Sequence, residues 1–283
     1  IPKYGIMLVY RCWFNLILTN VEVIIMRERN KVANVFTDIA PKWNDKGNLI
    51  ASCIGQKNPF KTEYKNWIRS GMRILDVGCG AGKNLLKIDS EYEDCELHGI
   101  DISEKMVEIA KQNSANAKNR IVFANVDFLE FNSEEKYDVI IFNYVLHHME
   151  KPQLAIEKAY SLLKNYGLIM LTLPGTEYLK ETFPYCHDVI DDSIGRFSRG
   201  KVENMFDAFK VVQLLYKKSI FLMRFDSYEQ YMQYLKSIGT YQKIVNYSLK
   251  KWSTEFERLV MNSYLNAEYI TGHYDMYVYF KKE

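Results

Sequence analysis

Between residues 71 and 175, short apolar runs alternate with segments that carry apolar residues on one helical face. Continuous apolar runs that end near glycine, aspartate or proline are typical of strands buried on both sides. In residues 103–116, Ser103 is placed to cap a helix, and one helical face carries Met106, Val107, Ile109 and Ala110. The predicted strands are RILDVG (73–78), CELHGID (95–101), RIVFANVDF (120–128), the start of YDVIIFNYVLHHM (137–149) and LIMLTLP (168–174).

The flanking segments show other patterns. Apolar residues recur at helical spacing within 26–54 and predict a helix, and residues 61–70 predict a short helix that ends at Gly71. Residues 175–208 look like an insertion that covers the ligand site. Downstream of it we expect a long strand or strand pair (211–225), two helices (227–238 and 251–265) and an alternating strand suited to a sheet edge (274–280).

The regular alternation of strand and helix predicts an α/β fold with a parallel sheet and helices on both faces. The helix expected over 151–167 carries Pro152 near its start and Gly167 just past its end, which is the usual asymmetry. Residues 1–25 are apolar but interrupted by polar residues, unlike a membrane-spanning helix. Because a natural start is recognisable at Met26, we expect residues 1–25 to be an extension without catalytic role; the alternative is an ordinary packed helix or strand.

Composition narrows the class of protein only slightly. The 37 Lys and Arg against 35 Asp and Glu give a net charge of +2, which provides no global argument for a nucleic-acid or membrane partner. The five cysteines form no C-x-x-C pair, which argues against a zinc site and a secreted disulfide framework. We therefore expect a cytoplasmic protein, a monomer or homodimer, without a metal site.

Three glycines, Gly78, Gly80 and Gly82, fall within five positions at the end of the first predicted strand. In open α/β sheets ligands bind at this edge, and a glycine-rich turn lets the backbone approach them. The spacing G-x-G-x-G followed by Lys83 departs from the dinucleotide pattern, and Asn84 stands where a phosphate-binding loop has Ser or Thr. A phosphate is therefore the weaker choice of ligand.

Two acidic residues suggest a nucleoside instead. Asp101 ends the second strand, where a carboxylate can accept hydrogen bonds from a ribose diol, and Asp127 ends the third, where it could meet an adenine amino group. Each has a plainer interpretation: Asp101 as a charge at a helix N-terminus, and Asp127 as a loop residue. Asp76 could likewise bond the amides of its own turn.

The segments ILDVGCGAGKNLLKI, LHGIDIS, ANVDFLEF, YDVIIFNYVLHHM and LLKNYGLIMLTLP resemble, in order, the motifs of class I S-adenosylmethionine-dependent methyltransferases. The resemblance covers about residues 71–175. It implies a Rossmann-like, seven-stranded, mostly parallel sheet with one antiparallel strand near its end, and S-adenosyl-L-methionine as cofactor with S-adenosyl-L-homocysteine as product. The residues that it implies for cofactor binding are Asp76, Gly78, Cys79, Gly80, Gly82, Asp101, Ile102, Asp127, Phe128, Asn143 and Tyr144, the last two near the methyl group.

Methyl transfer from a sulfonium is an in-line displacement, for which the protein supplies position and a dry site. A carboxylate or thiolate acceptor needs no base, whereas a phenol or carbon acid does. His147 and His148 are the candidate catalytic bases, since histidine titrates near neutral pH. The alternative is that one of them caps the following helix while the other packs or faces solvent; His187 and His273 are weaker candidates.

The segments around this core suggest a cover. Residues 35–45, VFTDIAPKWND, resemble the entry segment of ubiquinone/menaquinone-type and malonyl-carrier-protein methyltransferases, so Phe36 and Trp43 either form a lid or pack in the core. Arg196 and Arg199 could pair with a substrate carboxylate or be surface charges. We expect one domain over 26–283, with a helical lid (26–70), a cofactor-binding core (71–175) and a substrate-covering insertion with C-terminal strands (176–283).

The leading functional hypothesis is methylation of an oxygen or carbon atom of a small-molecule metabolite, with a carboxyl group as one option. A second is methylation of RNA or protein, although no stripe of Lys and Arg with interleaved aromatic residues supports it. A third is a catalytically silent subunit that keeps the fold and the cofactor, because fold alone does not prove activity.

Overall fold

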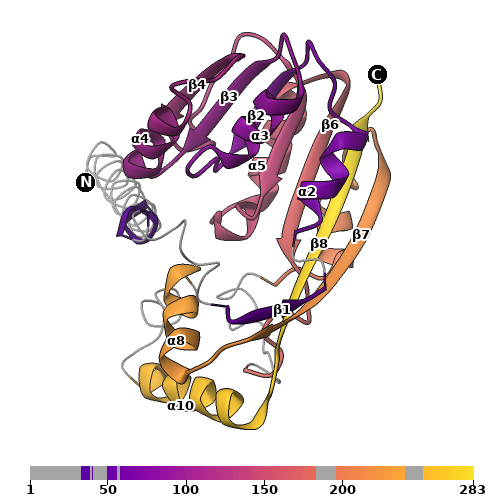
Figure 1. The fold of residues 1–283 in the computed structure, drawn as a ribbon. Coiled ribbons are helices and arrows are strands. Elements are labelled where there is room, and N and C mark those ends of the chain that lie inside the picture. The colour runs from indigo at the N-terminus through magenta and orange to yellow at the C-terminus, as the bar shows by residue number, and fades with distance from the viewer. Residues whose placement is uncertain (1–32, 39, 41–49, 56–57, 183–195, 240–250) are drawn as a thin grey trace, which may run out of the picture.

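A single eight-stranded sheet forms the centre of the protein in a computed structural model, which describes residues 33–38, 40, 50–55, 58–182, 196–239 and 251–283 (Figure 1). Its order is β1-β7-β8-β6-β5-β2-β3-β4. The strands are β1 Ser52–Ile54, β2 Arg73–Val77, β3 Glu96–Asp101, β4 Arg120–Asn125, β5 Tyr137–Asn143, β6 Leu163–Pro174, β7 Val211–Arg224 and β8 Ile270–Lys281.

Helices connect these strands and continue beyond them. Residues 33–38 are helical and precede the sheet. The elements that follow are α2 Phe60–Glu63, the 3-10 helix η3 Tyr64–Asn66, α3 Lys83–Glu91, α4 Glu104–Asn113, the 3-10 helix η4 Leu146–His148, α5 Pro152–Leu162, α7 Arg199–Asn204, α8 Tyr228–Ser237 and α10 Lys251–Asn266. The helices predicted over 227–238 and 251–265 are thereby confirmed, and the segment 211–225 forms one long strand.

Five neighbouring strands, β4, β3, β2, β5 and β6, are parallel, whereas β8 is antiparallel to both β6 and β7. The predicted α/β class and the mostly parallel sheet are confirmed. The strand number is eight instead of seven, because residues 52–54 pair with the end of β7, Ile54 opposite Leu222. These residues lie in the stretch where we expected a helix, and that part of the prediction is wrong.

Two buried clusters, one on each face of the sheet, hold the helices in place. On one face, Phe60, Leu85 and Val107 of α2, α3 and α4 pack against strand residues such as Ile74. On the other face, α5 and α7 pack through residues that include Ile156. The sheet is therefore buried on both sides, as its all-apolar strands indicated.

The helix expected over 151–167 is shorter than its pattern suggested. Pro152 does occupy its first turn, but α5 ends at Leu162 and Leu163 already pairs with Tyr137 of β5. The register of this pairing then shifts, and Tyr166 adopts a φ of 66° before the parallel ladder resumes at Leu168. Gly167 thus belongs to an irregular stretch inside β6 and does not follow a helix end.

The alternating segment 274–280 is not an edge strand, which corrects the sequence prediction. It belongs to β8, which lies between β6 and β7. Alternate residues serve the two faces: Tyr277 and Tyr279 pack in one cluster and Met276 and Val278 in the other. The apparent polar alternation came from tyrosine, whose ring packs like that of any buried aromatic residue.

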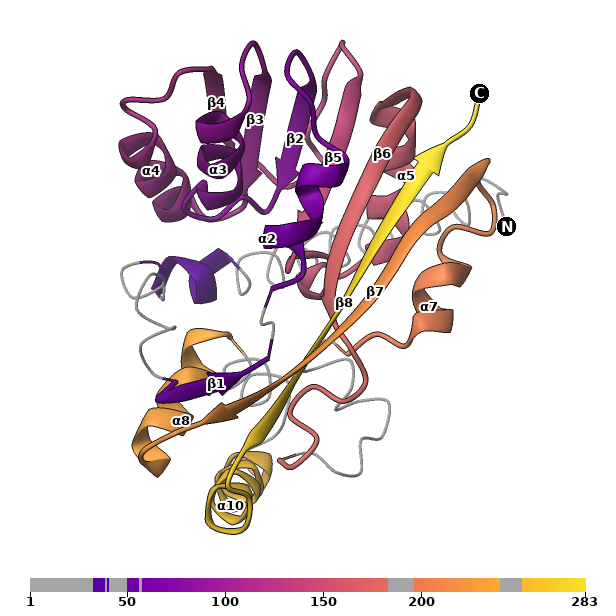
Figure 2. The same ribbon diagram turned by 45° about the vertical axis from the view of Figure 1, so that its right-hand side comes forward.

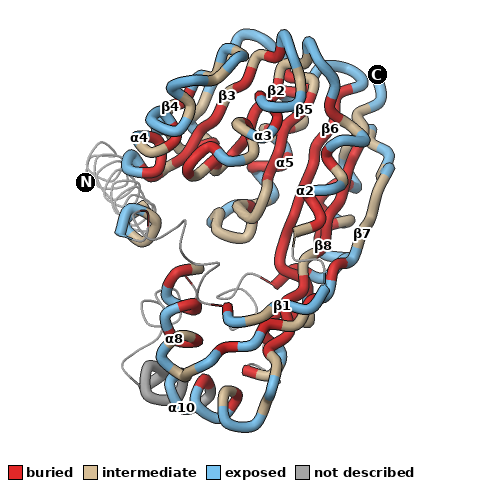
Figure 3. Tube along the Cα trace, in the orientation of Figure 1, coloured by how far each residue is buried: buried red, intermediate tan, exposed pale blue. Residues whose placement is uncertain are grey.

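The strands β7 and β8 extend past the carboxyl ends of the parallel strands (Figures 1 and 2). There the end of β7 and the start of β8 pack with β1, α8 and α10, a group that we call the covering unit. Its own buried cluster contains Phe221, Tyr231, Tyr234, Leu235 and Val260. Figure 3 shows that buried positions continue from the sheet into this unit. No helix in the described ranges is long and apolar enough to cross a membrane.

Candidate functional site

The glycine turn lies between β2 and α3, at the carboxyl edge of the sheet that faces the covering unit (Figure 1). Gly78, Gly80 and Gly82 have φ angles of 65°, 52° and 77°, in the left-handed region that favours glycine. Gly82 is also the N-cap of α3. Cys79 is buried, and its backbone N–H donates to Ile100 O at 3.0 Å, which ties the turn to β3.

Space is as restrictive as backbone conformation at Gly78. A Cβ atom added there would lie 2.2 Å from Val145 Cγ2. Val145 follows β5, so the turn after β2 packs directly on the segment that leads to η4. The absence of a side chain at Gly78 is therefore what allows these two segments to meet.

Asp101 connects the glycine turn with the following helix. One carboxylate oxygen accepts a hydrogen bond from the Gly80 N–H at 2.9 Å, and the other accepts from the Ser103 N–H at 2.9 Å. Ser103 in turn caps α4 by accepting from Met106 N. Burial raises the pKa of Asp101, while the two backbone hydrogen bonds oppose that shift. A carboxylate has lone pairs left for a diol after accepting two such bonds.

Asp76, Asn84 and Asn143 form a chain of side-chain hydrogen bonds across the site. Asn84 Nδ2 lies 3.1 Å from Asp76 Oδ2, and Asn143 Nδ2 lies 3.1 Å from Asn84 Oδ1. Asp76 is fully buried, and its partner is this amide and not the turn amides that were the plainer interpretation. Asn84 carries no motif that predicts a role in the site; the signal in the sequence was its place in the first turn of α3, directly after Gly82 and Lys83.

Burial raises the pKa of Asp76 from 3.8 to about 7, with the Asn84 hydrogen bond lowering it and the charge of Asp101 raising it. The folded protein therefore keeps a proton at pH values where the unfolded chain has lost it. In that window stability falls as the pH rises. The contribution is flat below the unfolded pKa and again above the folded pKa.

We expect Asp76 to make a pH-dependent contribution to the unfolding free energy, and the Asp76→Asn substitution should remove it. As the pH rises from 4 to 7, the unfolding free energy of the wild type should fall relative to that of the variant by at most about 4 kcal/mol. Urea unfolding of both cofactor-free proteins at a series of pH values measures the difference, in which other groups cancel. Parallel pH profiles would contradict the assignment.

The residues expected near the adenine lie at the next strand end. Ile102 is half-buried after β3. Asp127 Oδ1 accepts from Leu129 N at 2.8 Å, so this side chain shapes its own turn. Phe128 is buried, with its ring edge-on to Phe142 at 5.4 Å in the main core cluster. Cofactor contacts of these three residues stay predictions.

Tyr144 directly follows β5 in a left-handed conformation, with a φ of 62° that is uncommon for tyrosine. Its N–H donates to Thr172 O at 3.0 Å, and its ring packs 4.4 Å from the ring of Tyr274 of β8. The Tyr144 hydroxyl is enclosed and has no hydrogen-bond partner among the described residues. Burial, then Tyr274 and Tyr234, raise its pKa well above the ordinary value, so the phenol is neutral near pH 7.

Further tyrosines connect Tyr144 to the covering unit. The hydroxyls of Tyr178, which follows β6, and Tyr234 of α8 lie 3.2 Å apart. The Tyr178 ring lies 5.5 Å from that of Tyr274. The end of β5, the start of β8 and helix α8 therefore meet through aromatic residues.

His147 and His148 lie together in η4, with ring centroids 3.9 Å apart. The His148 ring also meets Phe36 edge-on at 4.9 Å, and Thr37 Oγ1 lies 3.0 Å from Ser103 Oγ. The N-terminal helical residues 33–38 thus contact both η4 and the start of α4. The N-cap of α5 is Lys151, so neither histidine caps that helix as the plainer interpretation supposed.

The remaining candidates separate clearly. Arg196 is buried, and its Nε donates to Tyr178 O at 2.6 Å, whereas Arg199 is exposed and pairs with Glu203 at 2.7 Å. His273 is buried in β8, with Nε2 3.0 Å from Asp275 Oδ1 and Nδ1 accepting from Glu177 N. His187 and Trp43 lie outside the described residues. In the described ranges no cluster of three His, Cys, Asp or Glu residues could hold a metal ion.

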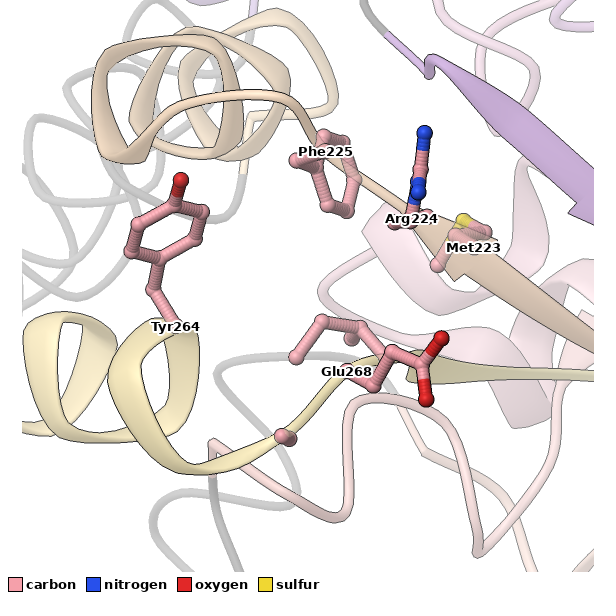
Figure 4. A pocket seen from close by; sticks show the side chains of 7 residues that line it. Met223, Arg224, Phe225, Tyr264 and Glu268 are labelled. Atoms are coloured by element: carbon pink, nitrogen blue, oxygen red, sulfur yellow. The ribbon is translucent and has the colours of Figure 1, made fainter.

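A cavity of about 160 Å³ lies in the covering unit and not at the glycine turn (Figure 4). Met223, Arg224 and Phe225 line one side, and Tyr264 and Glu268 line the other. None of its lining residues comes from the strand ends that carry the glycine turn, Asp101 or Asn143, so we assign it no part in binding a nucleoside.

The site residues fit a nucleoside with an amino-acid tail. We predict that the backbone of the glycine turn approaches the ligand and that the Asp101 carboxylate binds the ribose. Asn143 Oδ1 is enclosed and has no hydrogen-bond partner among the described residues, which suits an amine donor of the ligand. An α/β domain with a glycine turn and an acidic residue at the carboxyl edge of its sheet is typical of proteins that bind a nucleoside cofactor.

Comparisons with known proteins give the family. The pattern of the family described as "Methyltransferase domain" matches residues 68–233, more than half of the chain. The chain therefore belongs to the class I S-adenosylmethionine-dependent methyltransferases, whose cofactor is S-adenosyl-L-methionine. The resemblance inferred from the five sequence motifs is thereby confirmed.

Individual relatives are more distant. A carboxy-S-adenosyl-L-methionine synthase of Nautilia profundicola is 28% identical over 148 residues, which cover 50% of this chain and 58% of the relative. A malonyl-[acyl-carrier protein] O-methyltransferase of Halalkalibacterium halodurans is 25% identical over 219 residues, 71% of this chain and 79% of the relative. The solved structure of YjhP from E. coli, 16% identical, has a TM-score of 0.52 over 80% of this chain and 95% of that one, which supports the fold. The chain thus spans little more than half of the synthase that it matches.

Proposed function

We propose that this protein transfers the methyl group of S-adenosyl-L-methionine to an oxygen or carbon atom of a small-molecule metabolite, with a carboxylate among the eligible acceptors. The observation that carries the proposal is the enclosed Tyr144 hydroxyl at the end of β5, between the cofactor-binding edge and the covering unit. A neutral phenol enclosed among aromatic rings suits a small acceptor better than a nucleic-acid backbone, which needs a cationic surface.

When bound, the cofactor supplies the electrophilic methyl group. The chain orients the reactants: Asp101 and the glycine turn hold the nucleoside, and Asn143 the amino-acid end. The Tyr144 hydroxyl, which is a donor at neutral pH, binds an oxygen of the acceptor. The covering unit and the helical residues 33–38, which contact His148 and Ser103, exclude water from the reacting atoms. A carboxylate acceptor needs no base; a phenolic acceptor would place His147 or His148 in that role.

Incubation of the purified protein with methyl-labelled S-adenosyl-L-methionine and deproteinised metabolite extract tests the proposal. Label is expected in the small-molecule fraction, and the Asp101→Ala variant should transfer far less label at the same low cofactor concentration. A parallel incubation with total RNA and protein tests the alternatives. Transfer only to a macromolecule, or binding of S-adenosyl-L-homocysteine without any turnover, would contradict the proposal.

Tyr144→Phe is expected to lower kcat/KM for the acceptor found in this way by about tenfold, because one hydrogen bond of about 1.5 kcal/mol is lost. The affinity for S-adenosyl-L-homocysteine should stay within about twofold of that of the wild type. The variant removes only the hydroxyl that binds the acceptor and keeps the rest of Tyr144, which we expect to line the site near the methyl group. Tyr166→Phe, an exposed tyrosine in the irregular part of β6, is the matched control. Equal losses of cofactor affinity and turnover in Tyr144→Phe would contradict this role.

A further inference from the structure

The hydrogen-bond chain between β2 and β5 has a direction. Asp76, once ionised, can only accept hydrogen bonds. The Asn84 amide must therefore turn its NH2 group toward Asp76, where Nδ2 lies 3.1 Å and 3.4 Å from the two carboxylate oxygens. Its carbonyl oxygen is then left to face Asn143.

The same requirement passes to the next residue. Because Asn84 presents an oxygen, Asn143 turns its own NH2 group toward it, with Nδ2 and Oδ1 3.1 Å apart. The Asn143 Oδ1 then points away from the chain, and it is the enclosed atom without a partner among the described residues. An acceptor-only carboxylate thus fixes the orientation of an amide two residues along the network.

We propose that Asn84 is a positioning residue that makes Asn143 Oδ1 accept a hydrogen bond from the α-ammonium group of S-adenosyl-L-methionine. This inference rests on the proposed function, which supplies the cofactor. An ammonium group carries donors only, so it matches a presented oxygen. Asn143 lies on the β5 side of the glycine turn, whereas Asp101 and Asp127 occupy the β3 and β4 side, which leaves the amino-acid end of the cofactor for Asn143.

Protonation of Asp76 can reverse the donor and acceptor roles in the hydrogen bonds between Asp76, Asn84 and Asn143. A protonated carboxyl can donate to Asn84, both amides then turn over, and Asn143 presents its NH2 group to the ammonium. The titratable groups that act electrostatically with Asp76 are Asp101, whose charge raises the Asp76 pKa, and the Cys79 thiol. Burial raises the pKa of Cys79 well above its ordinary value, so it is neutral. Since the pKa of Asp76 is raised to about 7, the ammonium site should weaken as the pH falls through neutrality.

Two ligands separate the ammonium contact from the rest of the site. S-Adenosyl-L-homocysteine carries the α-ammonium, and 5′-methylthioadenosine has the same nucleoside and sulfur but no amino-acid tail. Both are titrated calorimetrically, from pH 6 to 8.5, into the wild type, Asn84→Leu and the exposed control Asn66→Leu. Circular dichroism verifies that each protein is folded.

We expect Asn84→Leu to lower the affinity for S-adenosyl-L-homocysteine by about tenfold or more at pH 8, in line with a lost hydrogen bond to a charged group. The affinity for 5′-methylthioadenosine should change by less than about twofold. The Asn66→Leu protein should bind both ligands with the affinity of the wild type. In the wild type the homocysteine ligand should lose affinity below pH 7 and methylthioadenosine should not. In Asn84→Leu this pH dependence should disappear, because the amide that links the protonation state of Asp76 to the orientation of Asn143 is gone.

Other outcomes overturn the inference. If Asn84→Leu lowers the affinity for both ligands equally, Asn84 is a structural residue only. If neither affinity changes, the hydrogen bonds of Asn84 have no role in cofactor binding. A loss of S-adenosyl-L-homocysteine affinity below pH 7 that is as large in Asn84→Leu as in the wild type would also contradict the inference. Failure of the folded wild type to bind either ligand would instead overturn the proposed function itself.

Discussion

Replacing Asp101 by alanine is expected to lower the affinity for S-adenosyl-L-homocysteine by about 100-fold or more. The variant loses the partner of the ribose diol and also the hydrogen bonds to Gly80 N and Ser103 N. Hydrogen bonds to a charged group contribute about 1.5–3 kcal/mol each, so the loss of those to the ribose accounts for an effect of this size. The glycine turn and the start of α4 also lose the carboxylate that holds them together. Isothermal titration calorimetry of the two proteins measures the ratio of dissociation constants.

Asp207→Ala is the matched control for this variant, because it removes an exposed carboxylate from the segment after α7. Its affinity should equal that of the wild type. An Asp101→Ala protein that is folded and binds the ligand within about threefold of the wild type would mean that the ribose lies elsewhere.

A Gly78→Ala substitution should be the most damaging change in the glycine turn. The residue has a φ of 65°, and the new Cβ would lie 2.2 Å from Val145 Cγ2. Left-handed strain and overpacking each cost about 1–3 kcal/mol, so we expect about 2–6 kcal/mol of lost unfolding free energy and no measurable cofactor binding. Denaturant unfolding and calorimetric titration provide the two measurements.

Two further variants isolate the cause. In the double variant Gly78→Ala with Val145→Ala the clash is relieved and the strain remains, so part of the stability should return. Gly200→Ala is the control, since a Cβ at that position in α7 meets nothing within 4 Å. Equal stability of Gly78→Ala and Gly200→Ala would contradict the packing seen at the turn.

The sequence allowed the cofactor-binding half of the fold to be predicted because its strands are buried on both faces. Buried parallel strands contain continuous apolar runs, and the turns at their carboxyl ends contain glycine and aspartate. The segments that were wrongly predicted depend on long-range pairing. Residues 52–54 become a strand only because the end of β7 is beside them, and α5 gives way to β6 at Leu163 because Tyr137 pairs there.

At the candidate site, sequence reasoning found the residues whose position in a motif is informative, such as Asp101 and Asn143. It did not find Asn84, because a helix-surface amide has no pattern that indicates two partners from different strands. It also could not rank Arg196 and Arg199, which differ in burial and not in sequence context. Those distinctions depend on which side chains the fold brings together.

The interior position of β8 affects how the protein is made. During synthesis β6 and β7 leave the ribosome long before residues 270–281, yet each pairs with β8 and not with the other. The sheet therefore remains in two pieces, each with an open edge, until β8 inserts antiparallel between them. Pairing across such long sequence separations is slow and exposes unpaired edges to aggregation. A nascent chain that stalls before residues 270–281 leave the ribosome would consequently expose these edges to chaperones, even though most of its cofactor-binding half is already complete.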